Sequence, residues 1–222
     1  QSRGELMLEV YNAMTLNAYA GQTMQEFNLV IGRPKQQIEE EQDGVPVTKL
    51  VMDRVTFTFV EGMLQSWEYT NPLFKNPLDE SFNSFLKAIE LNQKGKGKEK
   101  MAEDMQMLKK LVITEGSNSY SNKDYDNSFK LFSKAIEIGL NPLVGSVDTV
   151  LFFYAGLSAQ LDNKLDNAIE YYQKSIDYGY YAAGNVFYYI YDAYKTLDRA
   201  GDGLKYLQDG FLKEPSNQNI LY

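Results

Sequence analysis

DNSFKLFSKAIEIG, the stretch from Asp126 to Gly139, returns forty residues later as DNAIEYYQKSIDYG, Asp166–Gly179. Two looser copies are DESFNSFLKAIELN, Asp79–Asn92, and GDGLKYLQDGFLKEP, Gly201–Pro215. Each copy places apolar residues three and four positions apart, which is the pattern of an amphipathic helix. Repetition at a period of a few tens of residues is typical of stacked helical units, so this stretch predicts the fold class.

A second helix is predicted upstream of each copy. Gly116 lies twelve positions before Ser128, and Gly156 lies twelve positions before Ala168, whereas Tyr191 takes this place in the last copy. Small residues on two neighbouring helices let the backbones approach closely, so each pair is expected to pack as a helical hairpin. The Asn- and Asp-rich turns between the helices favour the start of a new helix.

These positions resemble the signature of the tetratricopeptide repeat family, whose units are about 34 residues long. The residues that carry the resemblance are Gly116, Ser128, Phe132 and Ala135; Gly156, Ala168, Tyr172 and Ser175; Gly62, Ser81, Phe85 and Ala88; and Gly203, Gly210 and Pro215. The resemblance implies an all-α fold, a right-handed α-α superhelix of about four hairpins. Its units would span residues 47–92, 109–142, 149–180 and 184–217, within an array over residues 47–222. Residues 1–46 would form an N-terminal helical cap and an acidic loop.

In that family the first helices of the units line a concave groove that binds a peptide or a partner helix. The resemblance therefore implies a partner-binding groove formed by Phe59, Met63, Tyr120, Phe153, Leu157, Tyr188, Asp192 and Lys195. Aromatic residues at helical spacing serve equally well as core, which is the alternative at each of these positions. The Lys, Asn and Arg residues with which some members hold a C-terminal carboxylate are missing, because Ile113, Ser117 and Phe153 occupy those places.

The composition excludes several kinds of chemistry. The 222 residues include no Cys and no His, which excludes disulfides, thiolate and imidazole metal sites and His-dependent nucleophiles. Acidic and basic residues alternate along the predicted helices, as on ordinary solvated helix faces. A carboxylate pair for glycoside cleavage is the catalytic arrangement that this composition leaves open. We expect a protein that is not an enzyme, with no catalytic residues, no cofactor and no metal.

The expected partner is a protein or peptide. The formal net charge of −8 disfavours nucleic acid, and no apolar run is long enough for a transmembrane segment. Self-association into a homo-oligomer stays open. The alternative function is a glycan-binding accessory protein of the cell envelope that uses exposed Tyr residues and Trp67.

The repeats have Tyr-rich units, long loops and no Cys, and in this they are similar to exported repeat proteins of Gram-negative anaerobic bacteria. This similarity favours a periplasmic, cell-surface or secreted location, with a cytoplasmic location as the alternative. Ala18-Tyr19-Ala20 resembles a signal-peptidase site, but polar residues interrupt the stretch before it, so a helix is expected there. Because the chain starts at Gln1 without Met, we expect that an upstream segment was removed; a secretory signal peptide is one explanation, and artificial trimming of the sequence is the alternative.

Overall fold

A computed structural model describes residues 2–92 and 95–221 of the chain, which forms two compact units. Unit 1 extends to Lys123 and includes Pro142–Val144, and unit 2 comprises Asp124–Asn141 together with the residues from Gly145 onward. The outer limits of the predicted cap and array, Gln1 and Tyr222, lie outside the described residues.

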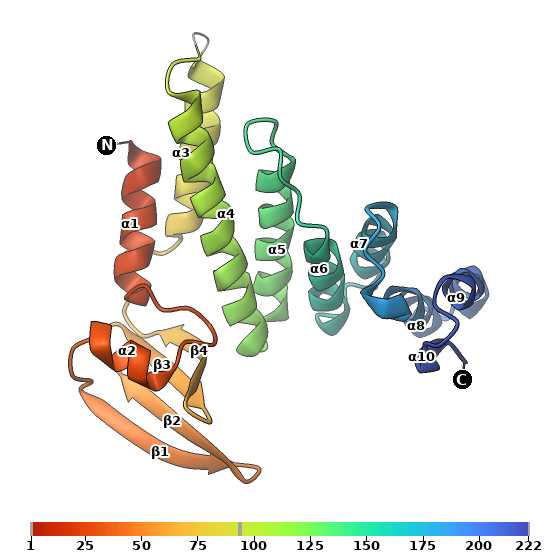
Figure 1. Cartoon of the computed structure of the whole chain (residues 1–222), viewed down its shortest axis with the longest axis horizontal. Coiled ribbons are helices and arrows are strands. Elements are labelled where there is room, and N and C mark those ends of the chain that lie inside the picture. Colours follow the sequence, from red (N-terminus) through yellow and green to blue (C-terminus); the bar gives the residue numbers. More distant parts are fainter. Residues whose placement is uncertain (1, 93–94, 222) are drawn as a thin grey trace. The chain divides into compact units, whose positions relative to one another are not determined.

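Unit 1 combines helices with an antiparallel sheet (Figure 1). Its helices and strands are α1 (Arg3–Thr15), α2 (Met24–Val30), β1 (Gln36–Gln42), β2 (Val45–Val51), β3 (Val55–Val60), β4 (Met63–Tyr69), α3 (Pro77–Leu91) and α4 (Lys98–Ser121). The four strands pair in chain order, β1-β2-β3-β4, so the sheet is a simple meander.

Turn chemistry and alternation explain the sheet. Asp43 and Gly44 connect β1 to β2, and Glu61 and Gly62 connect β3 to β4; all four residues have positive φ. Two successive residues with positive φ are the requirement of the two-residue hairpin turn whose twist matches that of the strands. Strand β3, with the sequence VTFTFV, buries every second residue, which is the period of a strand with one face on a core.

The short helix α2 covers the buried face of this sheet. The ring of Phe27 meets Phe57 edge to face at 4.7 Å and Phe59 at 5.1 Å between ring centroids. Leu50, Leu64 and Trp67 complete the same apolar cluster. Burial of large aromatic rings on one side of the strands gives the sheet a core of its own.

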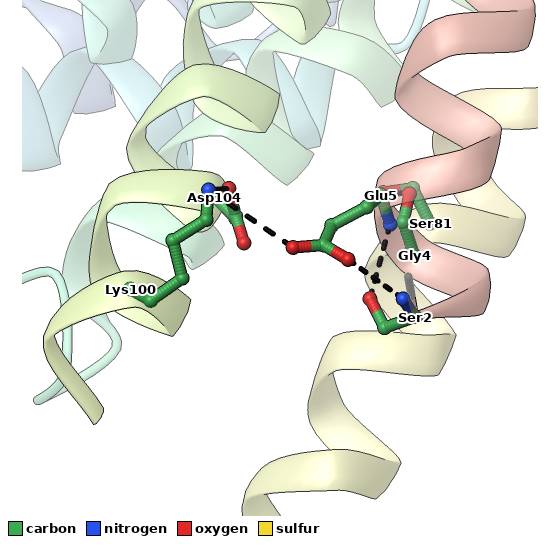
Figure 2. A network of polar contacts seen from close by, with 6 residues as sticks. All are labelled: Ser2, Gly4, Glu5, Ser81, Lys100 and Asp104. Carbon is green, nitrogen blue, oxygen red and sulfur yellow. Dashed lines mark hydrogen bonds and ion pairs between the residues drawn. The ribbon is translucent and has the colours of Figure 1, made fainter. Parts of the chain in front are cut away.

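Helix α1 packs on α3 through a close contact at the first turn of α1. Ser2 and Glu5 form a capping box, and the Ser81 hydroxyl of α3 donates a hydrogen bond to the Gly4 carbonyl at 3.0 Å. Figure 2 shows this turn beside α4, where Lys100 bridges Glu5 and Asp104. The backbone hydrogen bond from Ser2 lowers the pKa of Glu5, as expected for a carboxylate at a helix N-terminus.

Unit 2 is helical in the part that the structure describes. Its elements are α5 (Tyr125–Leu140), α6 (Val150–Leu161), α7 (Leu165–Asp177), a 3₁₀ turn (Ala182–Gly184), α8 (Asn185–Thr196), α9 (Ala200–Lys213) and α10 (Gln218–Leu221). From α5 to α9, each helix packs on the next one in the chain (Figure 1).

Small residues make these contacts close. A methyl group placed on Gly156 of α6 would lie 2.6 Å from the Tyr172 ring of α7, closer than any relaxed contact. The hydroxyls of Ser128 in α5 and Ser158 in α6 are hydrogen-bonded at 3.0 Å in a buried contact. The buried Gly203 and Gly210 turn one face of α9 towards α8.

The predicted all-α fold is wrong, because residues 36–69 contribute a four-stranded sheet. The region predicted as the first helix of the 47–92 unit forms β2, β3 and β4, and β1 lies within the predicted cap and acidic loop. Gly62, assigned to that helix as its small residue, lies in a hairpin turn with φ of +78°. Apolar residues that alternate with period two cannot share one face of a helix, so this segment folds as strands.

Candidate functional site

The structure places the eight predicted groove residues in three different settings. Phe59 is fully buried in the sheet core, and Met63 is exposed at the start of β4. Neither residue is on a helix, so the prediction that Phe59 and Met63 line a groove between helices is wrong. Tyr120 is half-buried on α4 in unit 1. The other five residues are on α6 and α8 of unit 2.

We call the surface formed by these two helices the α6–α8 face. It consists of Phe153, Leu157 and Gln160 of α6 and Tyr188, Asp192 and Lys195 of α8. The Gln160 side-chain amide donates a hydrogen bond to Asp192 at 2.8 Å, which joins the two helices across this face. Each set of three occupies positions i, i+4 and i+7 of its helix, so its members lie on one side of that helix.

Aromatic rings of unit 2 pack against Phe153 of this face. Phe153 makes ring contacts at 5.6–6.0 Å with Tyr154, Tyr172, Tyr180 and Tyr189. Tyr172 is fully buried and stacks on Tyr189 at 5.8 Å. The half-buried ring of Phe153 therefore packs against the core of unit 2, which is the alternative given for this position.

A chain of hydrogen bonds orients the polar groups of the face. The Tyr172 hydroxyl donates to the Gln160 carbonyl oxygen at 2.8 Å, and the Gln160 amide donates to Asp192. Lys195 is exposed and forms no ion pair within the residues that the structure describes. The face thus offers apolar rings, a fixed amide and carboxylate, and the Lys195 cation, which together suit recognition of a polypeptide segment.

A second polar cluster lies in unit 1 and is centred on the largely buried Glu115 of α4. Tyr11 of α1 and Tyr69 of β4 both donate hydrogen bonds to Glu115 Oε2, at 2.8 and 3.0 Å. Burial raises the pKa of the Glu115 carboxyl, although the hydrogen bonds from Tyr11 and Tyr69 oppose that shift. Burial and the neighbouring carboxylate also raise the pKa of both tyrosines.

The backbone of β4 is tied to α4 beside this cluster. The Trp67 N–H donates to Asn118 Oδ1 at 2.8 Å, and Asn122 donates to the Trp67 carbonyl at 2.9 Å. The cluster was not predicted from the sequence, because Glu115 is 104 positions from Tyr11 and 46 from Tyr69. No local spacing marks such a contact, and its role in the structure is to join α1, β4 and α4.

Trp67 does not form part of an exposed sugar-binding surface. Its side chain is 1% exposed, and its indole N–H donates to the Tyr69 hydroxyl at 3.2 Å. A ring that stacks on a sugar must be open to solvent. Trp67, the one Trp of the chain, therefore cannot serve the glycan-binding alternative in this way. Tyr19, Tyr154 and Tyr178 are exposed.

Membrane-spanning helices and metal-binding clusters are both missing from residues 2–92 and 95–221. No helix there is both long and apolar enough to cross a membrane. No group of three or more Asp or Glu side chains in those ranges is placed to hold a metal ion. The sequence matches no protein-family model and no curated protein.

Proposed function

We propose that the chain is a non-catalytic binding protein whose α6–α8 face holds a segment of a partner protein. The observation that carries this proposal is the hydrogen bond between Gln160 and Asp192, which links α6 to α8, the helices that precede the repeated patterns on α7 and α9. In this proposal α6 to α9 act like tetratricopeptide hairpins, and the partner contacts the first helix of each.

The chemistry of the face defines the partner segment. Leu157 and Tyr188 are partly exposed apolar side chains that can bury an aliphatic or aromatic side chain of the partner. Lys195 favours a carboxylate nearby, since it lacks an ion-pair partner in the described residues. We therefore propose a segment with an apolar residue followed within one helical turn by Asp or Glu.

Pre-organisation supports binding at this place. Gln160 is held by Tyr172 on one side and Asp192 on the other, so its side chain loses little further freedom when a partner binds. Phe153 is fixed by its ring contacts. A face whose side chains are already ordered loses less entropy on association than a flexible one.

Selection from a random peptide display library tests the proposal. The intact chain should enrich peptides that carry an apolar residue near an acidic one. Lys195→Glu should shift the selected peptides from acidic to basic residues at that position. Leu157→Asp should reduce enrichment at least tenfold, because a charge then faces the apolar side chain of the peptide.

The matched control is Lys205→Glu, which reverses the charge of another exposed lysine of unit 2 outside the α6–α8 face. It should leave the selected peptides unchanged. Circular dichroism melting shows whether Leu157→Asp remains folded. Peptide preferences that are the same for the original chain and for Lys195→Glu would contradict the proposal.

A further inference from the structure

A hollow in unit 1 is formed by four segments that are far apart in the sequence. They are the end of α1, the end of α2, the turn between β2 and β3, and the segment after β4. Its volume is about 440 Å³, within the range of about 300–1,000 Å³ that is typical of small-molecule sites. We call it the unit 1 hollow. The α6–α8 face belongs to unit 2, so a role for this hollow does not depend on the proposed function.

The inner wall of the unit 1 hollow is apolar. Val55, which is 1% exposed, belongs to the buried cluster of the sheet. Leu16, Ile31 and Met52 also line the hollow, and all three are partly buried and pack against that cluster. An apolar group placed against these side chains would be removed from water, as it is in a protein core.

The rim of the hollow carries the cation Arg54. Its Nη1 donates a hydrogen bond to the Asn71 carbonyl at 3.2 Å, which ties the guanidinium to the segment after β4. This bond uses one of the five N–H donors of a guanidinium. The others can hold a carboxylate with two parallel hydrogen bonds, which is the geometry that arginine favours.

The charges around the rim favour an anion. Residues 30–35 and 52–54 contain three cations and one carboxylate, a formal charge of +2 in a chain whose net charge is −8. The one carboxylate, Asp53, is paired with Lys35 at 2.6 Å, so its charge is already balanced. The local charge is therefore opposite in sign to that of the whole chain and suits a negatively charged ligand.

The walls of the hollow are ordered by the backbone of unit 1. The Asn17 N–H donates to the Asn12 carbonyl at 3.0 Å and fixes the turn that ends α1. The Thr70 N–H donates to the Arg54 carbonyl at 2.8 Å and holds the β2–β3 turn against the segment after β4. A site with fixed walls loses little conformational entropy when a ligand enters.

We propose that the unit 1 hollow binds a small amphiphilic monocarboxylate. The apolar tail lies against Leu16, Ile31 and Met52, and the carboxylate accepts hydrogen bonds from Arg54. An anionic membrane surface would also combine apolar and negative groups, but the net charge of −8 disfavours contact with such a surface. A single carboxylate responds mainly to nearby cations, because salt screens charges beyond about 8 Å.

An NMR titration of the intact, ¹⁵N-labelled chain with octanoate tests this proposal. Octanoate should shift the amide signals of residues 13–17, 30–32 and 52–55 in a saturable way. Two further probes separate the parts of the ligand. Uncharged 1-octanol should bind about tenfold more weakly or less, because it lacks the carboxylate. Acetate should also bind more weakly than octanoate, because it lacks the apolar tail.

Two variants test the two ends of the hollow. Arg54→Ala should weaken octanoate binding about tenfold or more and leave 1-octanol binding unchanged. Its control is Arg3→Ala, which removes another arginine of unit 1, paired with Glu80, and should bind octanoate like the original chain. Leu73→Asp puts a charge on a lining residue that is 51% exposed, and it should also weaken binding. Circular dichroism melting shows whether each variant is folded.

Three outcomes would overturn the proposal. The first is an octanoate titration that gives no saturable shifts, or shifts that lie outside the lining segments. The second is equal affinity of the original chain for octanoate and 1-octanol, which would exclude a role for Arg54 without any variant. The third is binding to phosphatidylglycerol vesicles in the absence of octanoate binding, which would assign the rim to a membrane surface.

Discussion

Helices α3 and α7 carry copies of the same sequence pattern, yet different parts of the chain complete them. A methyl group placed on Gly156 would lie 2.6 Å from Tyr172 of α7, and Gly156 belongs to the helix directly before it. A methyl group placed on Gly4 would lie 2.7 Å from Phe85 of α3, and Gly4 belongs to the first helix of the chain. The same contact between glycine and an aromatic ring thus recurs in both units.

The difference lies in what separates the two halves of the contact. A short turn links α6 to α7, whereas α2 and the whole sheet lie between α1 and α3. The cost of closing a longer connection rises slowly with its length, and the sheet has a core of its own around Phe57 and Trp67. The repeated pattern therefore encodes a surface that needs a partner helix, and it leaves open which helix that is.

The largest effect is expected from removing the aromatic ring in either unit. Tyr172→Ala and Phe85→Ala should each lower the free energy of unfolding by about 3–5 kcal/mol, because each leaves a cavity at a buried helix contact. Urea unfolding followed by Trp67 fluorescence reports on unit 1, and circular dichroism reports on all helices. A cost below about 1 kcal/mol for Phe85→Ala alone would show that the two contacts are not equivalent.

Adding a methyl group to the glycine should have the next largest effect. Gly156→Ala and Gly4→Ala should each cost about 1–3 kcal/mol of unfolding free energy through overpacking against the ring. On a Tyr172→Ala background, Gly156→Ala should cost almost nothing, because the clashing ring is gone. The control is Gly201→Ala in α9, where a methyl group meets nothing within 4 Å; this change should stabilise by about 0.5–1 kcal/mol.

Because Glu115 is largely buried in unit 1, the stability of the original chain should depend on pH differently from that of Glu115→Gln. The pKa of Glu115 is raised in the folded state, so the folded chain binds more protons than the unfolded chain and loses stability as pH rises above about 4.5. Glu115→Gln should therefore gain stability relative to the original chain as pH rises, in urea unfolding from pH 4 to 8.

Glu170→Gln in unit 2 is the matched control for that measurement. Glu170 is exposed on α7 and pairs with Lys174 at its surface. Its substitution should change the free energy of unfolding by only a few tenths of a kcal/mol, because an exposed ion pair on a helix contributes little. Equal pH profiles for Glu115→Gln and the original chain would contradict the raised pKa.

The smallest effect is expected from the residue that differs between the two contacts. Ser81 of α3 donates a hydrogen bond to the Gly4 carbonyl, whereas α7 has Ala168 at the corresponding place. Ser81→Ala should cost about 0.5–1.5 kcal/mol of unfolding free energy, measured by urea unfolding. A cost above about 3 kcal/mol would mean that this hydroxyl, and not the packing of Phe85, holds α1 on α3.

Part of the fold could be predicted from the sequence. The repeated patterns are present as α3, α5, α7 and α9, because apolar residues three and four positions apart identify a helix locally. The sheet could also have been predicted. Asp43-Gly44 is a typical two-residue hairpin turn, and the apolar Val55, Phe57 and Phe59 alternate with threonines, as in a strand. The resemblance to a helical repeat instead placed Gly62 on a helix, and so predicted no strand in this region.

The candidate site was predictable to a smaller extent. The spacing of Phe153 and Leu157 puts them on one side of a helix, and the structure places them on α6 as half-buried residues. The hydrogen bond between Gln160 and Asp192 joins residues 32 positions apart, so no local pattern could show it. The burial of Trp67, which weakens the glycan-binding alternative, results from the sheet, which was not predicted from the sequence.

Local order along this chain can therefore be read from neighbouring residues: helices where apolar side chains recur every three to four positions, and close approach where Gly or Ser stands. Two features required the folded molecule, namely the completion of α3 by α1 and the meeting of Tyr11, Tyr69 and Glu115. Periodicity is written in residues a few places apart, whereas pairing across a hundred positions depends on which distant surfaces bury the most area together.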